Sequence, residues 1–138
     1  MACAQLRGMH RWGVTGTIKH FCANNQESNR HHVDAVVSER ALREIYLKGY
    51  EIAVKEGGAR SIMSTYGPVN GIWTAGNYDL LTTILRGEWN YDGFVMTDWW
   101  AMSNREGYEA EHPQRFFLFR SAVKDAGIAR RQFMDNGG

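Results

Sequence analysis

The sequence predicts an α/β fold in which short parallel strands alternate with helices. Three apolar segments, near residues 14–21, 60–66 and 93–98, have the composition of strands. Two longer segments between them repeat apolar residues at the spacing of a helix. The order strand, helix, strand, helix, strand is typical of a parallel sheet, because each helix returns the chain to the end where the next strand begins.

Residues 1–11 read as the end of a helix, and Gly13 is expected to terminate it. Residues 14–21 then combine Val, Thr, Ile and Phe, which favour strands. The loop that follows, residues 22–33, is rich in Asn and other hydrogen-bonding side chains. Such a loop suits the recognition of hydroxyl groups, but it is equally typical of an ordinary solvated loop.

The clearest helix is predicted over residues 39–55. Ser38 is a favourable N-cap, and Glu39 places negative charge near the positive end of the helix. Gly57 and Gly58 are expected to end it. The predicted buried stripe consists of Leu42, Ile45, Tyr46, Gly49, Ile52 and Ala53.

Residues 60–66 form the next predicted strand, and a turn-rich loop with Asn70-Gly71 leads to a second helix. Asn77 is the expected N-cap of that helix. A turn at residues 90–93 then leads into the strand near residues 93–98, whose apolar run suggests burial on both faces. The stripe of the second helix consists of Leu80, Leu81, Ile84 and Leu85.

Side chains suited to binding or catalysis follow each predicted strand. Lys19 and His20 end the first strand, Tyr66 ends the second and Asp98 ends the third. Ligands of parallel α/β folds bind at the carboxyl ends of the strands. A carboxylate at the end of a buried strand is costly unless a partner or a function uses it. Taken alone, this stretch favours the simpler interpretation that Asp98 caps a following helix.

Composition restricts the possible functions. The 138 residues suffice for one ordinary domain, and 43% of them are hydrophobic. A net charge of +1 argues against nucleic acid or an anionic membrane as a partner. Residues 1–11 lack the apolar core of a signal peptide and no transmembrane span is evident, which favours the cytoplasm.

No metal or other cofactor is expected. Cys3 and Cys22 have neither the spacing of metal ligands nor that of a disulfide framework, so both are expected to be free thiols. The adjacent His31 and His32 cannot easily face one ion, and no supporting cysteine or carboxylate spacing accompanies them.

Several motifs follow one another in a characteristic order. They are Lys19-His20-Phe21, Asn24-Asn25-Gln26-Glu27, Arg30, Ser38-Glu39-Arg40, Asn70-Gly71, Glu88-Trp89 and Gly93 through Trp99. Over roughly residues 5–100 this series resembles glycoside hydrolase family three, the β-glucosidase and β-xylosidase group. The resemblance implies a partial (β/α)8 TIM-type barrel over residues 1–100, roughly its later half. Residues 101–138 are expected to form a divergent, helical C-terminal tail.

The resemblance also implies roles for individual residues. Asp98 corresponds to the catalytic nucleophile of a retaining enzyme that hydrolyses terminal non-reducing β-D-glucosyl or related residues. The substrate-binding positions that it implies are Lys19, His20, Arg30, Tyr66 and Trp99. Retaining hydrolysis also needs a second carboxylic acid, about 5–5.5 Å from the first.

That second acid is not evident in this chain. In the glucosidase branch a glutamate of a following α/β domain supplies it, so this domain and the missing barrel half are expected in the full-length protein. His31, His32 and Asp34 do not match the His–Asp motif of the hexosaminidase branch. Glu27 is another acid near the expected site, and we interpret it as structural or sugar-facing.

We therefore expect the isolated chain to turn over a β-linked glycoside or oligosaccharide very poorly. The alternative is a catalytically inactive fragment that only binds sugar or is a remnant. Two positions depart from the family pattern in the matched region: Gly67 stands where asparagine is common, and Asn90 replaces a usual glycine. Asparagine tolerates a positive φ, so the second departure is mild.

Overall fold

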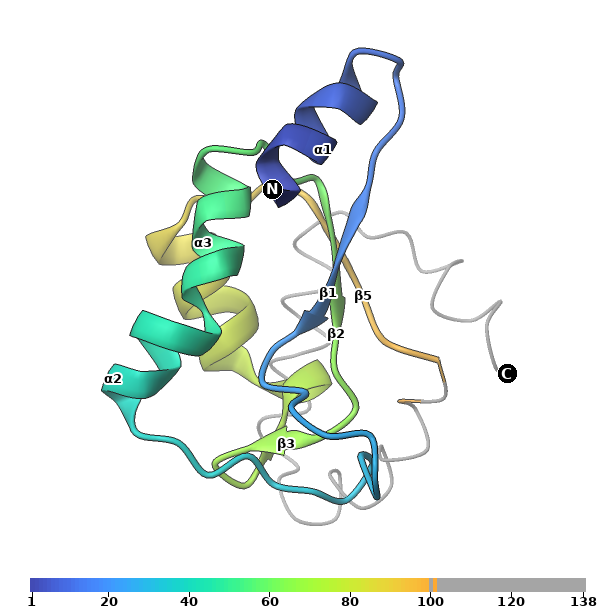
Figure 1. The fold of residues 1–138 in the computed structure, drawn as a ribbon. Helices are drawn as coiled ribbons and strands as arrows, with labels where there is room; N and C mark the ends of the chain where they lie inside the picture. Colours follow the sequence, from blue (N-terminus) through green and yellow to red (C-terminus); the bar gives the residue numbers. More distant parts are fainter. Residues whose placement is uncertain (100, 102–138) are drawn as a thin grey trace.

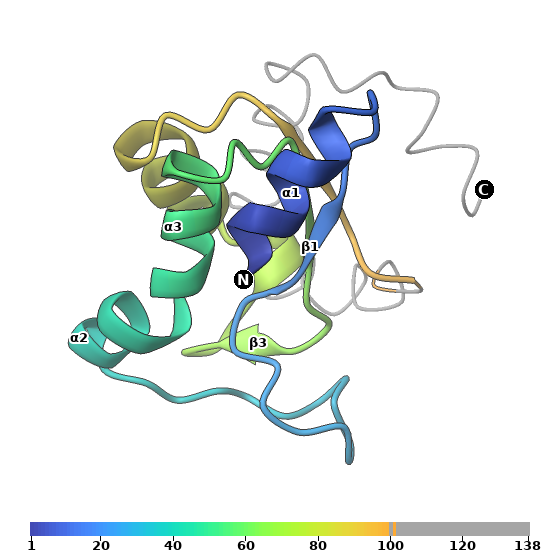
Figure 2. The same cartoon turned by 45° about the horizontal axis from the view of Figure 1, so that its top comes forward.

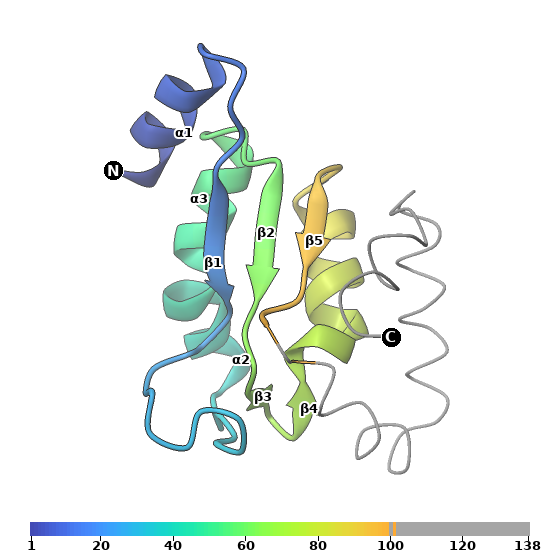
Figure 3. The same ribbon diagram turned by 90° about the vertical axis from the view of Figure 1, so that its right-hand side faces the viewer.

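The computed structural model describes residues 1–99 and 101, and its centre is a parallel sheet. The sheet contains β1 (Thr17–Phe21), β2 (Ser61–Ser64) and β5 (Phe94–Met96) in the order β1-β2-β5 (Figure 3). The prediction of three parallel strands is thus confirmed, although each strand is shorter than predicted. The predicted tail, residues 101–138, lies outside the described residues except for Ala101.

The register of the sheet places core-facing residues of the three strands next to one another. Ile18 pairs with Ile62, and Ile62 pairs with Val95. All three contact the hydrophobic core beneath the helices. Because successive residues of a strand point to opposite faces, Thr17 and Ser61 lie on the other face, where their hydroxyl oxygens are 2.7 Å apart.

Helices cover one face of this sheet (Figures 1 and 2). The short helix α2 (Glu39–Ala41) continues through a π-helical turn, η1 (Leu42–Tyr46), into α3 (Lys48–Lys55). The preceding helix, α1 (Ala2–His10), lies at the amino ends of the strands and packs on α3 through Leu6.

The π-helical turn changes which side chains of this segment are buried. The amide of Leu47 donates to the carbonyl of Leu42 at 2.8 Å, so residues five apart share a face. Leu42 and Leu47 are 5% and 1% exposed, whereas Ile45 is 69% exposed. The predicted stripe is therefore wrong at Ile45, and it is also wrong at Gly49 and Ile52, which are exposed, because it assumed an uninterrupted α-helix over residues 39–55. The predicted N-cap is confirmed, since the hydroxyl of Ser38 accepts from the amide of Ala41 at 3.2 Å.

The second crossover begins with a hairpin. Its strands, β3 (Pro68–Val69) and β4 (Ile72–Trp73), are antiparallel, and a 3-10 turn, η2 (Thr74–Gly76), follows them. The helix η3 (Asp79–Glu88) then packs on the sheet with π-type geometry. None of the helices in the described part of the chain is both long and apolar enough to cross a membrane.

Both predictions for the second helix are confirmed. The side-chain oxygen of Asn77 accepts from the amide of Leu80 at 3.1 Å, which satisfies a free donor in the first turn. The predicted stripe is buried throughout, at Leu80, Leu81, Ile84 and Leu85.

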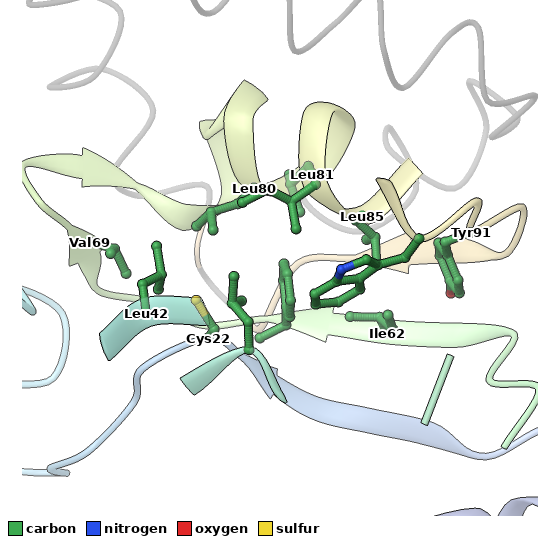
Figure 4. Packing of buried hydrophobic residues seen from close by; sticks show 12 residues of the cluster. Cys22, Leu42, Ile62, Val69, Leu80, Leu81, Leu85 and Tyr91 are labelled. Carbon is green, nitrogen blue, oxygen red and sulfur yellow. The ribbon is translucent and has the colours of Figure 1, made fainter. Parts of the chain in front are cut away.

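The hydrophobic core fills the space between the sheet and the helices (Figure 4). Phe21, at the end of β1, is fully buried and meets the rings of Tyr50 and Trp89 edge-on, at centroid distances of 5.0 and 6.2 Å. Cys22 is buried in the same cluster, and both it and Cys3 are free thiols, as predicted. This packing fixes the position of the end of β1, and therefore also the position of His20, the residue before Phe21.

The third strand differs from its prediction in burial. Phe94, Val95 and Met96 are half-buried rather than buried on both faces. Within the described residues β5 is an edge of the sheet, so no strand covers its outer side. Asn90, at the turn before this strand, has a φ of +56°, which asparagine tolerates as expected.

Candidate active site

The candidate site surrounds Asp98, which follows β5 by two residues at the carboxyl end of the sheet (Figure 3). Asp98 is 6% exposed, so its carboxylate is largely removed from water. One of its oxygens, Oδ1, accepts from the backbone amide of Trp99 at 2.7 Å. The other, Oδ2, lies 3.1 Å from Nε2 of His20. Both oxygens therefore have a defined orientation.

His20 comes from the strand at the opposite edge of the three-stranded sheet from β5. It belongs to β1, and β2 lies between β1 and β5. Ile18 and Phe21 both face the core, and the pairing of β1 with β2 shifts register between them, so an irregularity of the strand, and not simple alternation, lets His20 reach Asp98. The 3.1 Å between Nε2 and Oδ2 is an ion-pair distance when the imidazole carries a proton on Nε2.

Tyr66 is the third group at the carboxylate. It follows β2, is 5% exposed and lies close enough to Asp98 to interact with its charge. Burial raises the pKa of Tyr66, and the charge of Asp98 raises it further, whereas the Arg30 guanidinium opposes the change. The neutral phenol is therefore favoured, which keeps an O–H donor beside the carboxylate.

Arg30 and His31 both contact the ring of Tyr66. The guanidinium carbon of Arg30 lies 4.7 Å from the ring centroid, and the ring centroid of His31 lies 4.1 Å away. Both residues come from the polar loop after β1, whose role the sequence left open between a solvated loop and a binding loop. The structure shows that this loop packs against Tyr66.

Within the loop, Glu27 connects two other polar side chains. Its carboxylate accepts from the amide of Asn24 at 3.0 Å and from the guanidinium of Arg30 at 2.7 Å. The hydrogen bond from Asn24 lowers the pKa of Glu27, and the charge of Arg30 and its hydrogen bond lower it too, against an opposing effect of desolvation. Glu27 therefore favours its charged form beside Arg30.

The two remaining predicted site residues are exposed. Trp99 follows Asp98 directly and is 71% exposed, so its indole is available for packing against a ligand. Lys19, next to His20 on β1, is exposed and forms no ion pair with the other residues that the structure describes. The structure thus brings Asp98, His20 and Tyr66 into contact and leaves Lys19 and Trp99 open to solvent.

Sequence reasoning missed the contact of His31 with Tyr66, because it assessed this histidine only as a metal ligand or as a proton donor. His31 directly follows Arg30, which belongs to the family motif, and this position was the available signal that His31 lies near the site. Within residues 1–99 and 101, no group of three histidines, cysteines or carboxylates is arranged to hold a metal ion. The groups that the structure brings together at this site are the buried carboxylate of Asp98, the imidazole of His20 and the backbone amide of Trp99.

Comparison with known proteins identifies the family. The model of the glycosyl hydrolase family 3 N-terminal domain matches residues 1–126. The chain belongs to glycosyl hydrolase family 3. A β-glucosidase of Ruminococcus albus is 68% identical to it over 107 residues, which are 78% of this chain and 11% of the relative. The chain thus spans about a tenth of the length of that relative.

Solved structures of family 3 enzymes share the fold. A β-glucosidase from Paenibacillus barengoltzii superposes with a TM-score of 0.71 at 68% identity, over 72% of this chain and 11% of the other. β-Glucosidase 3B from Thermotoga neapolitana in complex with α-D-glucose gives 0.72 at 38% identity, over 94% of this chain and 20% of the other. The predicted fold class, a partial (β/α)8 barrel of the family 3 type, is thereby confirmed.

Proposed function

We propose that this chain is the nucleophile-bearing segment of a retaining β-glycosidase that hydrolyses terminal non-reducing β-D-glucosyl or related residues. The observation that carries the proposal is the buried Asp98 at the carboxyl end of β5, with an oriented donor at each oxygen. The family membership and the β-glucosidase names of the similar proteins support it.

In the proposed reaction, an oxygen of Asp98 attacks the anomeric carbon of the sugar while the bond to the leaving oxygen breaks. The product of this step is a covalent glycosyl-enzyme, which water hydrolyses in a second step. The hydrogen bond from the Trp99 amide and the contacts with His20 and Tyr66 hold the carboxylate in position before the attack.

Recognition of the sugar is assigned to the side chains at the rim of the site. Lys19, His20 and Arg30 offer N–H donors, which suit vicinal hydroxyl groups. The exposed indole of Trp99 suits the C–H face of a pyranose ring. These residues form only part of a sugar subsite, because the chain spans a small fraction of the length of its relatives.

The proton donor for the leaving oxygen is proposed to come from another part of the full-length protein. A retaining mechanism needs a second carboxyl group about 5–5.5 Å from the nucleophile. In the described part of the chain, the side-chain partners of the Asp98 carboxylate are an imidazole and a phenol. Glu27 is paired with Arg30 and Asn24 instead.

The test uses a sugar whose leaving group needs no proton. In 2-deoxy-2-fluoro-β-D-glucosyl fluoride, Asp98 can displace fluoride without an acid, and the 2-fluoro group slows hydrolysis of the adduct. After incubation of the chain, peptide mass spectrometry should find the fluoroglucosyl group on Asp98. Asp98→Asn should remain unlabelled, while Asp92→Asn, a change at an exposed acid before β5, should label normally.

Labelling at another residue, or equal labelling of Asp98→Asn, would contradict the assignment of the nucleophile. If glucose binds the chain saturably but no adduct forms, the chain binds sugar without catalytic competence. An alkyl β-glucoside, whose leaving group does need a proton, should be turned over very slowly by the isolated chain.

A further inference from the structure

Glu27 begins a continuous series of contacts that ends at Asp98. Its carboxylate accepts from Arg30 at 2.7 Å, and the guanidinium carbon of Arg30 lies 4.7 Å from the ring centroid of Tyr66. Tyr66 in turn lies beside Asp98, whose charge raises the pKa of its phenol. Glu27 itself is solvent-exposed, with a side chain that is 70% accessible, while the side chain of Arg30 is 34% accessible. The series therefore runs from the surface to the buried carboxylate.

Close packing against Gly67 fixes the backbone of the loop at Arg30. A Cβ atom on Gly67 would lie 2.8 Å from the carbonyl oxygen of Val33 and 3.2 Å from that of Arg30. The loop thus packs directly on the residue after Tyr66, and glycine at this position permits the close approach.

The side chain of Arg30 is held less firmly by the backbone alone. Several rotatable bonds separate the guanidinium from the main chain, so a fixed position over the ring requires a further contact. Glu27, three residues earlier, supplies an acceptor, and Asn24 holds the second oxygen of the same carboxylate. The carboxylate is thereby oriented from both sides.

We propose that Glu27 is a positioning residue that, together with Asn24, holds Arg30 over Tyr66 and so fixes the donor groups around Asp98. The proposal rests on the function proposed above, because it assigns Glu27 a role in the same sugar site. Arg30 is placed at the sugar in that proposal, and Glu27 acts through Arg30 without touching the sugar. The ion pair between Arg40 and Glu44 is an ordinary surface pair for comparison. Its arginine side chain is 84% accessible, whereas that of Arg30 is 34% accessible.

The first measurement does not depend on sugar binding. In a 1H–15N spectrum of arginine side chains, the Nε–Hε resonance of Arg30 should lie upfield of the others, because the ring of Tyr66 shields it. Arg30→Ala identifies the resonance and Tyr66→Leu should abolish the shift. Glu27→Ala should move the resonance to the ordinary arginine region, Glu27→Gln should retain part of the shift because it keeps an acceptor oxygen, and Glu44→Ala should leave it unchanged.

The second measurement is glucose affinity, followed by tryptophan fluorescence. Glu27→Ala should weaken binding about threefold to fivefold, the effect of losing one partly exposed ion pair. In an Arg30→Ala background, Glu27→Ala should cause no further loss, because its effect passes through Arg30. Glu44→Ala should bind like the unchanged protein.

The outcomes separate the two proposals. If the unchanged chain does not bind glucose, the proposed function fails, and the spectrum still decides whether Glu27 positions Arg30. An unshifted Arg30 resonance in the unchanged protein, or the same upfield shift in Glu27→Ala, overturns the positioning role. A further loss of affinity in the double variant overturns it as well, because Glu27 would then contact the sugar itself.

Discussion

Nε2 of His20 and Oδ2 of Asp98 lie 3.1 Å apart, although the two residues belong to segments on opposite sides of β2. The contact joins the first described strand of the sheet to the last. It orients the carboxylate oxygen that the Trp99 amide does not reach. The pair therefore holds the proposed nucleophile in one orientation before a substrate arrives.

Removing the imidazole should slow the labelling of Asp98. We expect His20→Ala to form the fluoroglucosyl adduct roughly ten to a hundred times more slowly, because a hydrogen bond to a charged group is lost. His20→Gln, which keeps a donor, should recover part of the rate. The rate is measured by intact-mass spectrometry over time, with the loop variant His32→Ala as control. A rate for His20→Ala equal to that of the control would contradict the role of this contact.

Trp99 should report sugar binding. Its indole is 71% exposed beside Asp98, so a bound glucose would change its surroundings. We expect glucose to quench the fluorescence of the chain saturably and Trp99→Phe to abolish the change. Trp12, which is 85% exposed and follows α1 at the other end of the sheet, provides the matched control. A response that survives in Trp99→Phe but disappears in Trp12→Phe would place the sugar elsewhere.

Alkaline pH should destabilise the chain through Cys22. Burial raises the pKa of this thiol from 9.0 to about 12, and burial also raises the pKa of Tyr50 and of Tyr91. A group whose pKa is higher in the folded state than in the unfolded state contributes its full stabilisation of the folded chain at pH values below the unfolded-state pKa. For Cys22 this contribution is lost as pH rises from 9 toward 12, by at most about 1.4 kcal/mol per pH unit.

Urea unfolding at pH 8, 9 and 10 measures this dependence. Cys22→Ala should show a shallower fall of the unfolding free energy with pH than the unchanged chain. Cys3→Ala, at a less buried thiol on α1, should keep the original slope. Equal slopes in all three proteins would show that Cys22 does not ionise with unfolding in this range.

The π-helical turn gives a prediction for stability. Leu47→Ala should lower the free energy of unfolding by about 2–5 kcal/mol, because it leaves a cavity in the core. Ile45→Ala should change it by no more than about 0.5 kcal/mol, because this side chain is exposed. Urea titration of both variants tests the turn directly. An uninterrupted α-helix, as the sequence pattern predicts, would instead make Ile45→Ala costly.

Much of the fold could be predicted because its determinants are local. The N-caps at Ser38 and Asn77 act on amides three residues away, and both hydrogen bonds are present. The alternation of strands and helices likewise predicted the parallel sheet. The π-helical turn was missed because spacings of 3.6 residues fit the apolar positions nearly as well. Only packing on the sheet decides that Leu47 rather than Ile45 faces inward.

The candidate site was predictable in its members but not in its contacts. The family motif selected Asp98, His20, Tyr66 and Arg30, and the structure places these four in one series of contacts. The sequence could not show that Glu27 faces Arg30, because a loop has no periodicity from which a side-chain direction follows. Nor could it show which of Lys19 and His20 reaches Asp98, since that depends on the irregularity of β1 between Ile18 and Phe21.

Because β2 lies between β1 and β5, it determines the distance between these two strands at the site. Neighbouring strands lie about 4.8 Å apart, so the outer two strands are held about 10 Å from each other across β2. Pairing with β2 sets this width, and the hydroxyl of Ser61 adds a side-chain contact to that of Thr17 on β1. The spacing between the strand that carries the imidazole and the strand that leads to the carboxylate is therefore specified by a segment that contributes neither group.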